Sequence, residues 1–590
     1  MVKVDYKRDK YLSKFSIKTL EDRYLLEGEK SPQDAFARAA QAFADDDDHA
    51  QRLYDYASKL WFMFSTPILS NGGSSRGLPI SCFLNYAEDS RGGITGHYTE
   101  NAFLSSVGGG IGGCWNGIRS VGSKTAAGSE STGVIPFIKV VDAEMLAFSQ
   151  GVTRRGSYAA YLDISHPEVE EFLDVRKPTG GDVNRKSVNL HHGVTIGDDF
   201  MELIEQATLV EGFDDSWDLI DPHTKEVKKT VSAKTLWVKL IQNRVETGEP
   251  YIMYKDTVQD ALPQYQKDLG LKVHHSNLCS EITLPTNEKR TAVCCLSSVN
   301  LEEYDEWCDD DQFIPDLVRM LDNVLTYFID KAPPELYRAV FSAENERSIG
   351  LGSMGFHAYL QRQDIAFESM WASSANHKMF TRIKSEATRA TQQLAKERGE
   401  CPDGKGHGIR NAHLLAVAPN ASSSIICGNT SPSIEPYRAN AFTQKTKSGS
   451  SLLKNEYLEH ILQEIGMDTD DVWKSIMTNA GSVQHLEFLD DHTKEVFRTG
   501  VEIDQRWVIQ HAADRQQYIC QSQSLNVFFP ADVSKQELHA IHMMAWKKKV
   551  KTLYYLRSEA MKRAENVSEE ALRKYVLDSL DENECLACEG

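Results

Sequence analysis

Hydrophobic and polar positions alternate with a helical period over the first part of the chain. An Ala-rich amphipathic run follows Ser31–Pro32 as far as Phe43, and a second run over 49–64 has apolar side chains three or four residues apart. A proline at the start of the first run is tolerated, because the first N–H groups of a helix have no partner within it. We therefore expect a helical N-terminal lobe over residues 1–65.

The composition and the periodicity of the sequence change after Thr66. From there to about Ser165, Gly and Ser are dense and the helical period fades. Such stretches are typical of tight turns and of backbone that approaches a ligand closely. Residues 165–168 then resemble a capping box that would begin a helix over 169–175.

The middle of the chain mixes short β-rich runs with long helical ones. The runs 282–284 and 291–296 have strand character, whereas 313–329 and 370–398 have helical periodicity. This mixture predicts an α/β domain over 66–567. The remaining segment, 568–590, is acidic and ends in Cys585-Leu586-Ala587-Cys588-Glu589-Gly590, so we expect a short helix followed by a flexible tail.

Composition and charge narrow the class of protein. The 590 residues have a formal net charge of −20, which argues against a broad surface for a nucleic-acid polymer. Neither a secretory signal nor a membrane-spanning run is apparent, so a cytoplasmic location with reduced thiols is expected. The eleven cysteines are then not a disulfide framework, and each is by default a small buried hydrophobe.

Three motifs have ordinary explanations that compete with functional ones. The glycines of 108–113 match a dinucleotide fingerprint formally, but Cys114-Trp115-Asn116-Gly117 is a poor helix start, so the glycines more plausibly let backbone approach a nucleotide in another fold. The pairs His191-His192 and His274-His275 lack a carboxylate at ligand spacing, and no metal site is expected. The terminal Cys585 and Cys588 could be half of a zinc site, but without a second such pair a redox dithiol fits better.

The most informative segment is 277–286, Asn-Leu-Cys-Ser-Glu-Ile-Thr-Leu-Pro-Thr. In an extended loop, alternation would put Asn277, Cys279 and Glu281 on one face, around one small volume. A further thiol follows in 293–301, Val-Cys-Cys-Leu-Ser-Ser-Val-Asn-Leu.

These two segments resemble the active-site loop of ribonucleotide reductase large subunits. Other pieces follow in the same order: Thr66-Pro67 and Ser81-Cys82-Phe83 resemble the substrate-binding strand, Gly110-Ile111-Gly112 the glycine turn beneath the sugar, Pro419-Asn420-Ala421-Ser422-Ser423-Ser424 the phosphate loop, and Lys551-Thr552-Leu553-Tyr554-Tyr555 the tyrosine pair of class I enzymes. The resemblance covers about residue 10 to the end. It implies a ten-stranded α/β barrel of two five-stranded halves, with a central finger loop that carries Cys279.

The resemblance also implies a division of labour in reducing ribonucleoside diphosphates. Cys279 forms a thiyl radical and takes the 3′ hydrogen, Glu281 accepts the 3′-hydroxyl proton, and Asn277 hydrogen-bonds the sugar. Cys82 and Cys294 supply two electrons, and Cys585 and Cys588 then reduce the resulting disulfide. The substrate-binding positions are Thr66, Ser81, Gly110, Ala421, Ser422 and Ser423.

One position in the loop is ambiguous, since Cys294 and Cys295 are adjacent where many family members carry one cysteine. Counting back six from Asn300 selects Cys294. Cys295 would point the opposite way if the segment is a strand.

The resemblance implies partners as well. No cofactor would be bound directly by this chain. A small subunit, usually with a dinuclear metal site, would generate the radical. Tyr554 and Tyr555 would relay that radical; the alternative is that they are simply two tyrosines of the core. A homodimer and a thioredoxin- or glutaredoxin-type reductant are expected. The alternatives are a cobalamin-dependent class II reductase, which needs no tyrosine relay, and an inactive nucleotide-binding paralogue, which would have lost catalytic cysteines.

Regulation is expected at family positions for effector nucleotides, ATP or a dNTP. Asp89, Ser90 and Arg119 match the effector grip, although Ala126 replaces one family arginine, and 150–155 resembles the loop that signals to the substrate site. The chain starts too late to hold the family's N-terminal ATP cone. With no such site, dATP is expected to act as an effector and not as an overall inhibitor.

Overall fold

The computed structural model describes residues 2–80, 82–148, 156–178, 180–446 and 449–558. Its centre is a sheet that closes on itself. The first half consists of five strands that pair in parallel in chain order: β2 (Cys82–Tyr86), β3 (Gly110–Cys114), β4 (Ser157–Asp163), β5 (His191–Ile196) and β8 (Tyr251–Tyr254). Helices α5 (Arg91–Ser106), α6 (Ile135–Ala147), α7 (Val169–Phe172), α8 (Asp198–Leu209) and α9 (Ala233–Thr247) lie in the connections between these strands, as crossovers between parallel strands require.

The strands of the second half complete the barrel and begin with a strand that runs antiparallel to the first half. Strand β9 (Ala292–Asn300) runs antiparallel to β2 and pairs in parallel with β10 (Ile349–Met354). The segments 415–417 and 521–524 continue this half through the parallel bridges Leu351↔Leu415 and Val417↔Gln523. Strand β14 (Thr552–Leu553) returns antiparallel to β8, and the Tyr554 N–H donates to the Leu525 carbonyl at 2.8 Å. The expected ten-stranded barrel of two halves is therefore confirmed.

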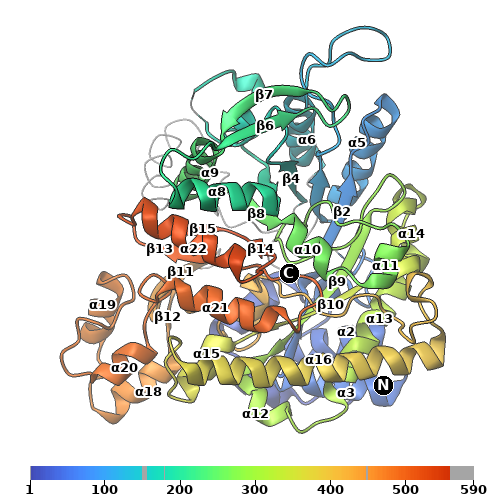
Figure 1. Ribbon diagram of the computed structural model, residues 1–590. Helices are drawn as coiled ribbons and strands as arrows, with labels where there is room; N and C mark the ends of the chain where they lie inside the picture. Colours follow the sequence, from blue (N-terminus) through green and yellow to red (C-terminus); the bar gives the residue numbers. More distant parts are fainter. Residues whose placement is uncertain (1, 81, 149–155, 179, 447–448, 559–590) are drawn as a thin grey trace.

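Long helices cover the second half. Helices α13 (Phe313–Lys331) and α16 (Met370–Arg398) match the expected ranges, and α16 runs across the lower half of the view in Figure 1. The remaining helices of this part are α10 (Lys255–Ala261), α11 (Gln264–Asp268), α12 (Tyr304–Trp307), α14 (Tyr337–Glu346), α15 (Phe356–Arg362), α17 (Ala421–Ile426), α18 (Glu456–Glu464), α19 (Asp470–Thr478), α20 (Asp491–Val496), α21 (Gln505–Gln516) and α22 (Lys535–Lys547). Three small two-stranded sheets complete the described part of the fold: β6 (Ser216–Ile220) with β7 (Val227–Ser232), β11 (Ala441–Thr446) with β12 (Gly449–Lys454), and β13 (Val527–Phe529) with β15 (Leu556–Ser558).

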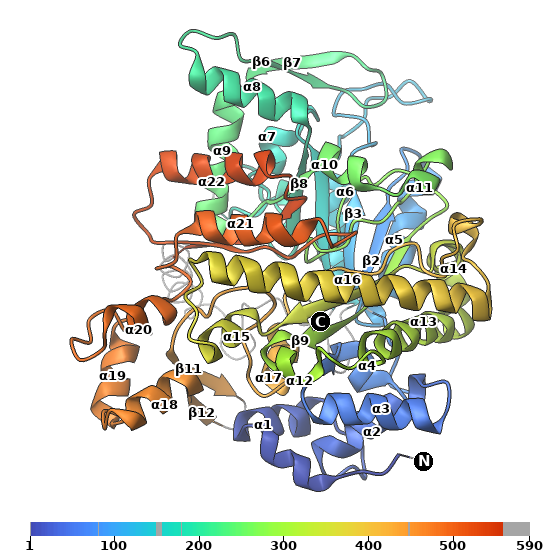
Figure 2. The same cartoon turned by 60° about the horizontal axis from the view of Figure 1, so that its bottom comes forward.

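The N-terminal lobe is helical, as expected, but its last segment is not. Helices α1 (Lys14–Arg23), α2 (Pro32–Phe43) and α3 (Asp47–Ser58) form a layer at the opposite end of the molecule from the β6–β7 hairpin (Figure 2). The second helix, expected over 49–64, ends at Ser58, because Leu60 takes φ 62° and cannot continue the helix. Residues Phe62–Phe64 then form β1, fully buried against β9, so the apolar run belongs to the barrel sheet.

Three helices were missed between 66 and 165, the short α4 (Thr66–Asn71) among them, and one expected cap does not form. Helix α5 begins with glycines at 92, 93 and 96, which weaken its helical signal, but Ser90 caps it by accepting the Gly93 N–H. Helix α6 is apolar on most of its surface, so its period is faint. The expected capping box at 165–168 does not form, since Glu168 is the N-cap without a side-chain cap bond and α7 ends at Phe172.

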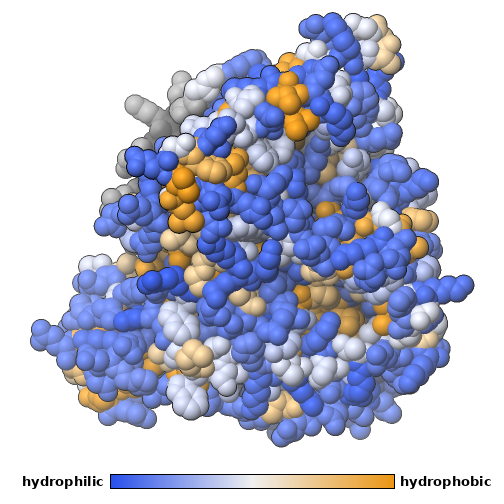
Figure 3. Space-filling view, viewed as in Figure 1, coloured by the Kyte–Doolittle hydropathy of each residue, from blue (hydrophilic) through white to orange (hydrophobic). Residues whose placement is uncertain are grey.

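The surface is mostly polar on the face in Figure 3, with hydrophobic residues scattered among charged ones. Among the described residues, every helix is too short or too polar to cross a bilayer. The interior is one large apolar cluster that joins the N-terminal lobe to the barrel, together with smaller clusters inside the barrel. Those smaller clusters are where the candidate site lies.

Candidate active site

A loop threads the barrel between His274 and Thr286 and carries the cysteine singled out by sequence. Its tip is a turn and not an extended segment, since Ser280 takes φ 66° and the Ser280 N–H donates to the Asn277 carbonyl. The Asn277 Oδ1 accepts the Ile282 N–H at 3.1 Å, which pins the two sides of the turn together. The expected extended conformation is therefore wrong at the tip of the loop.

The first half-barrel holds one side of this loop. The Tyr161 hydroxyl on β4 donates to the Asn277 carbonyl at 2.7 Å and lies 3.2 Å from Ser280 Oγ. His275 Nε2 lies 2.9 Å from the Gly112 carbonyl. A Cβ at Gly112 would collide with the Ser276 carbonyl and the Asn277 Cα, so glycine is required where the loop passes β3.

The second half-barrel holds the other side. The Ser524 Oγ lies 2.5 Å from the Cys279 carbonyl and 3.1 Å from Glu281 Oε2. The Ser522 N–H donates to the Glu281 carbonyl at 2.8 Å, and the Thr552 hydroxyl donates to the Ser280 carbonyl at 2.8 Å. The loop is thus fixed by backbone and side-chain bonds from both halves, which holds the Cys279 and Glu281 side chains in position.

Cys82 and Cys294 face each other across the two half-barrels. They are direct register partners in the antiparallel pair β2–β9, so their side chains point to the same face. Directly opposite positions in such a pair have Cα atoms about 4.5–5.5 Å apart, within the range that a disulfide spans. They share a buried cluster with Ile282 and Leu284 of the loop. Burial, with Cys295 and Cys82 nearby, holds the pKa of the Cys294 thiol well above its usual value.

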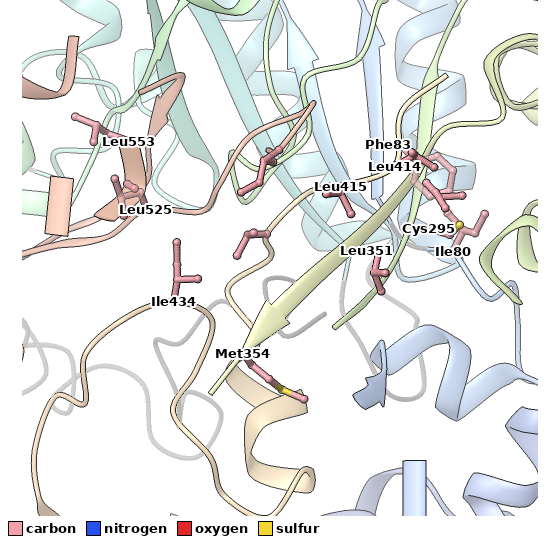
Figure 4. Packing of buried hydrophobic residues seen from close by; sticks show 14 of the residues in the cluster. Ile80, Phe83, Cys295, Leu351, Met354, Leu414, Leu415, Ile434, Leu525 and Leu553 are labelled. Atoms are coloured by element: carbon pink, nitrogen blue, oxygen red, sulfur yellow. The ribbon is translucent and has the colours of Figure 1, made fainter. Parts of the chain in front are cut away.

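Cys295 points to the other side of β9, as strand alternation predicts. Its Sγ lies 3.3 Å from the Leu321 carbonyl of α13, and it belongs to the main hydrophobic cluster. Figure 4 draws it in that cluster beside Ile80 and Phe83. Of the two adjacent cysteines, only Cys294 is therefore in the loop's cluster.

The tyrosine pair lies beside Cys279. Tyr554 and Tyr555 follow β14, are buried, and share one cluster with Cys279 and Leu278. Their ring centroids are 4.3 Å apart. Sequence reasoning did not foresee a third ring: Tyr251 on β8 lies 4.7 Å from the Tyr554 ring and 5.1 Å from the Tyr555 ring.

A buried group of polar side chains lies beside Tyr555. The Tyr555 hydroxyl lies 3.2 Å from His191 Nδ1, which also lies 2.6 Å from Glu249 Oε1. Arg176 pairs with the same carboxylate, and His192 lies 3.0 Å from its Oε2. Although burial alone would raise it, these partners hold the Glu249 pKa well below its usual value. The sequence analysis expected no metal site at His191-His192. In the structure, both histidines instead contact the Glu249 carboxylate.

The expected substrate-binding positions are spread over three elements. Thr66 begins the helix α4 (Thr66–Asn71) and not a strand, and its Oγ1 lies 3.0 Å from the Tyr24 hydroxyl. Gly110 is the first residue of β3, opposite Cys82, so the expected glycine turn is a strand. Ala421, Ser422 and Ser423 begin α17 after Asn420, which takes φ 57°. Ser81 lies outside the described residues.

The expected effector positions lie close together beyond the end of β2. The Arg119 Nε donates to Asp89 at 2.9 Å, and His223 Nδ1 lies 3.3 Å from the same carboxylate. Ser90 is used as the cap of α5. Segment 150–155 and the tail cysteines Cys585 and Cys588 lie outside the described residues.

The fold and the loop define a class: a ten-stranded barrel enzyme with a buried cysteine on a central finger loop, flanked by a facing cysteine pair and a tyrosine pair. Two family models match the chain, "Ribonucleotide reductase, all-alpha domain" over residues 10–77 and "Ribonucleotide reductase, barrel domain" over 80–405 and 403–556. The chain belongs to the ribonucleotide reductase large-subunit family.

Individual relatives agree with this assignment. The chain is 45% identical over 641 aligned positions to the ribonucleoside-diphosphate reductase large subunit of Invertebrate iridescent virus 3, covering 100% of both chains. It is 49% identical to the putative large subunit of Frog virus 3, covering 92% of each. Among solved structures, the class Id ribonucleotide reductase alpha subunit of Actinobacillus ureae matches with a TM-score of 0.81 and 36% identity, over 96% of this chain and 100% of that chain.

Proposed function

We propose that this chain is the catalytic subunit that reduces ribonucleoside diphosphates to 2′-deoxyribonucleoside diphosphates through a thiyl radical on Cys279. One observation carries the proposal: the finger loop joins two buried clusters, one with Cys279 and the tyrosine pair, the other with Cys82 and Cys294. An oxidising path and a reducing pair therefore meet at one loop. The names of the relatives support the diphosphate substrate.

The chemistry divides among the loop residues. The Cys279 thiyl takes the hydrogen from the 3′ carbon, and Glu281 accepts the 3′-hydroxyl proton as a general base. The 2′-hydroxyl takes one proton from the Cys82–Cys294 pair and leaves as water, and the 2′ carbon takes the second proton. Cys82 and Cys294 supply two electrons and become a disulfide, and Cys279 returns the hydrogen to the 3′ carbon. Asn277 contacts the sugar hydroxyls from the same loop.

The nucleotide would be held by the substrate-binding positions described above. Their short hydroxyl groups and backbone N–H groups suit phosphate oxygens. The Ser423 hydroxyl supports this role, since it is buried and has no hydrogen-bond partner among the described residues. Buried polar groups are ordinarily paired, so a ligand oxygen would satisfy it.

The oxidising equivalent comes from a second protein. Tyr554 and Tyr555 relay it to Cys279, and the 4.3 Å ring separation supports transfer between them. A small radical-generating subunit, with a dinuclear metal site of its own, supplies it. The tyrosine relay and the likeness to a class Id alpha subunit favour this reading over a cobalamin-dependent class II reductase or an inactive paralogue.

A homodimer fits the exposed surface of two helices. Large hydrophobic side chains on or next to α5 and α6 are exposed, and the two helices contact each other. The most exposed are Leu146 at 63%, Val140 at 47%, Phe148 at 41% and Phe103 at 36%. An exposed apolar patch of this kind typically marks an interface, and a two-fold dimer would pair it with itself.

Effector nucleotides would bind beside Asp89, Ser90 and Arg119, with 150–155 as the signalling loop. The Asp89–Arg119 ion pair supports the site, because it preorganises an acceptor and a guanidinium at one edge of the barrel. Effector binding would change substrate preference and promote dimers.

The test is CDP reduction by the purified chain with and without the small-subunit protein, using a dithiol reductant. Turnover only when both proteins are present is the expected result. Turnover that requires added adenosylcobalamin and no second protein would refute the class I assignment. In the same assay with a thioredoxin-type reductant, Cys585→Ser or Cys588→Ser should stop after about one turnover per site, because the tail only re-reduces the active-site pair.

A further inference from the structure

Cys520 differs from the other cysteines of the described residues in the groups that surround its sulfur. It lies between α21 and the barrel segment 521–524, and part of its surface is exposed, whereas Cys279 and Cys294 are buried. Its Sγ accepts two backbone N–H groups, from Leu414 at 3.1 Å and Leu415 at 3.2 Å. Two converging N–H donors at these lengths form an acceptor site for an anion, and hydrogen bonds shorten when the acceptor is charged.

Three basic side chains act on Cys520 or on its backbone. The His413 side chain faces the Cys520 thiol, the Lys384 ammonium acts on it through its charge, and Lys551 donates to the Cys520 carbonyl at 2.6 Å. His413 is 1% exposed, and its Nε2 lies 2.8 Å from Gln266 Oε1. Within the part of the chain that the structure describes, its Nδ1 has no other hydrogen-bonding group to pair with. Nδ1 is thus the imidazole atom available to the thiol.

The electrostatics follow from this arrangement. Burial alone would raise the pKa of the Cys520 thiol, but His413, Lys384 and the Leu414 N–H together lower it to about 5. The neighbouring Lys551 has a pKa lowered to about 8, chiefly by burial, with Cys520 acting in the opposite direction. A thiol with a low pKa is a thiolate at neutral pH, and the thiolate is the reactive form.

We propose that Cys520 is a modification site: a thiolate that hydrogen peroxide oxidises to a sulfenic acid, and that other soft electrophiles alkylate. The thiolate sulfur attacks one peroxide oxygen, so that an S–O bond forms and the O–O bond breaks. The departing hydroxide takes a proton and becomes water. Sulfur loses two electrons and the peroxide gains them, and a thiol reductant can reverse the change.

Cys520 lies outside the candidate active site but is one residue away from a side chain that reaches it. The next residue, Gln521, donates to the Ile349 carbonyl at 2.9 Å and lies 3.8 Å from Cys294 Sγ. A neutral sulfenic acid accepts the Leu414 and Leu415 N–H groups less well than a thiolate does. Oxidation would therefore loosen the start of this barrel segment.

The test is alkylation of the native full chain by iodoacetamide, measured for each cysteine peptide by mass spectrometry between pH 6 and pH 8. Cys308 is the matched control, because it is also partly exposed but burial and Asp309 raise its pKa. We expect the Cys520 rate to be nearly constant over this range. The Cys308 rate should rise about tenfold per pH unit, since its thiolate fraction does.

Comparison at a single pH is less informative than the profile. A thiolate of low pKa is intrinsically a weaker nucleophile, with a Brønsted slope of about 0.4–0.5, so the two cysteines could react at similar rates near pH 7. At pH 6, Cys520 should still react about tenfold faster than Cys308, and dimedone should trap its sulfenic acid first after peroxide treatment.

Two results would overturn the proposal. One is a Cys520 rate that rises with pH as steeply as that of Cys308. The other is an unlabelled Cys520 peptide in the native chain that becomes labelled only after denaturation. His413→Leu should shift the Cys520 profile to higher pH, and an unshifted profile would contradict the role of His413. Because these measurements need no turnover, they stand or fall separately from the proposed reductase activity.

Discussion

The hydroxyl of Ser524 offers a sharp test of how the barrel positions the loop. It lies 3.1 Å from Glu281 Oε2 and 2.5 Å from the Cys279 carbonyl, so Ser524→Ala removes a group that contacts both residues. A hydrogen bond to a charged group contributes about 1.5–3 kcal/mol. If Glu281 uses this bond in the transition state, kcat should fall by about 10- to 150-fold at about 1.4 kcal/mol per tenfold change.

A matched control separates positioning from stability. Ser342 is equally buried and donates to Glu346 Oε1 at 2.7 Å, in α14 and away from the loop. Ser342→Ala should cost a comparable 1–3 kcal/mol of unfolding free energy, roughly, and leave kcat nearly unchanged. Both variants are assayed for CDP reduction with the small subunit, and their stabilities are measured by urea unfolding. If Ser524→Ala loses no more kcat than Ser342→Ala, Ser524 does not position Glu281.

Three further predictions follow from the same geometry. Cys294→Ser should block normal product formation while Cys295→Ser retains most activity, because only Cys294 faces Cys82; the reverse result in a product assay would show that the register is wrong. Tyr555→Phe should abolish turnover without weakening substrate binding, since phenylalanine cannot be oxidised in a relay; retained turnover would exclude it from the path. Adding ATP or different dNTPs should change the relative rates of the four substrates, and identical ratios under every effector would contradict the effector site.

The parts of the fold that sequence predicts well are those with strong local signals. The ranges of α13 and α16 follow directly from long amphipathic periods, and α2 from its Ser–Pro start. Helix α5 was missed because three glycines lower its propensity, while tertiary burial of Ile94 and Leu104 still stabilises it. The strand β1 was assigned to a helix because an apolar run fully buried on both faces has no diagnostic period.

The residues of the candidate site could be proposed from the sequence, but their geometry could not. The family resemblance selected Cys279, Glu281 and the tyrosine pair, and strand alternation separated Cys294 from Cys295 correctly. Nothing local in the sequence indicates that Tyr251 packs on both tyrosines, or that Ser524 contacts Glu281, because these contacts join segments more than 200 residues apart. Such contacts depend on closure of the barrel, which the local pattern does not encode.

The proposed mechanism depends above all on Cys279 as the radical cysteine. Its most direct test is Cys279→Ser, assayed for multiple-turnover CDP reduction with the small subunit and reductant, with nucleotide binding measured in parallel. The serine variant should bind nucleotide like the parent chain and form no product, because a serine hydroxyl is not oxidised to the radical that takes the 3′ hydrogen. Sustained product formation by this variant, over many turnovers, would contradict the thiyl mechanism and the function built on it.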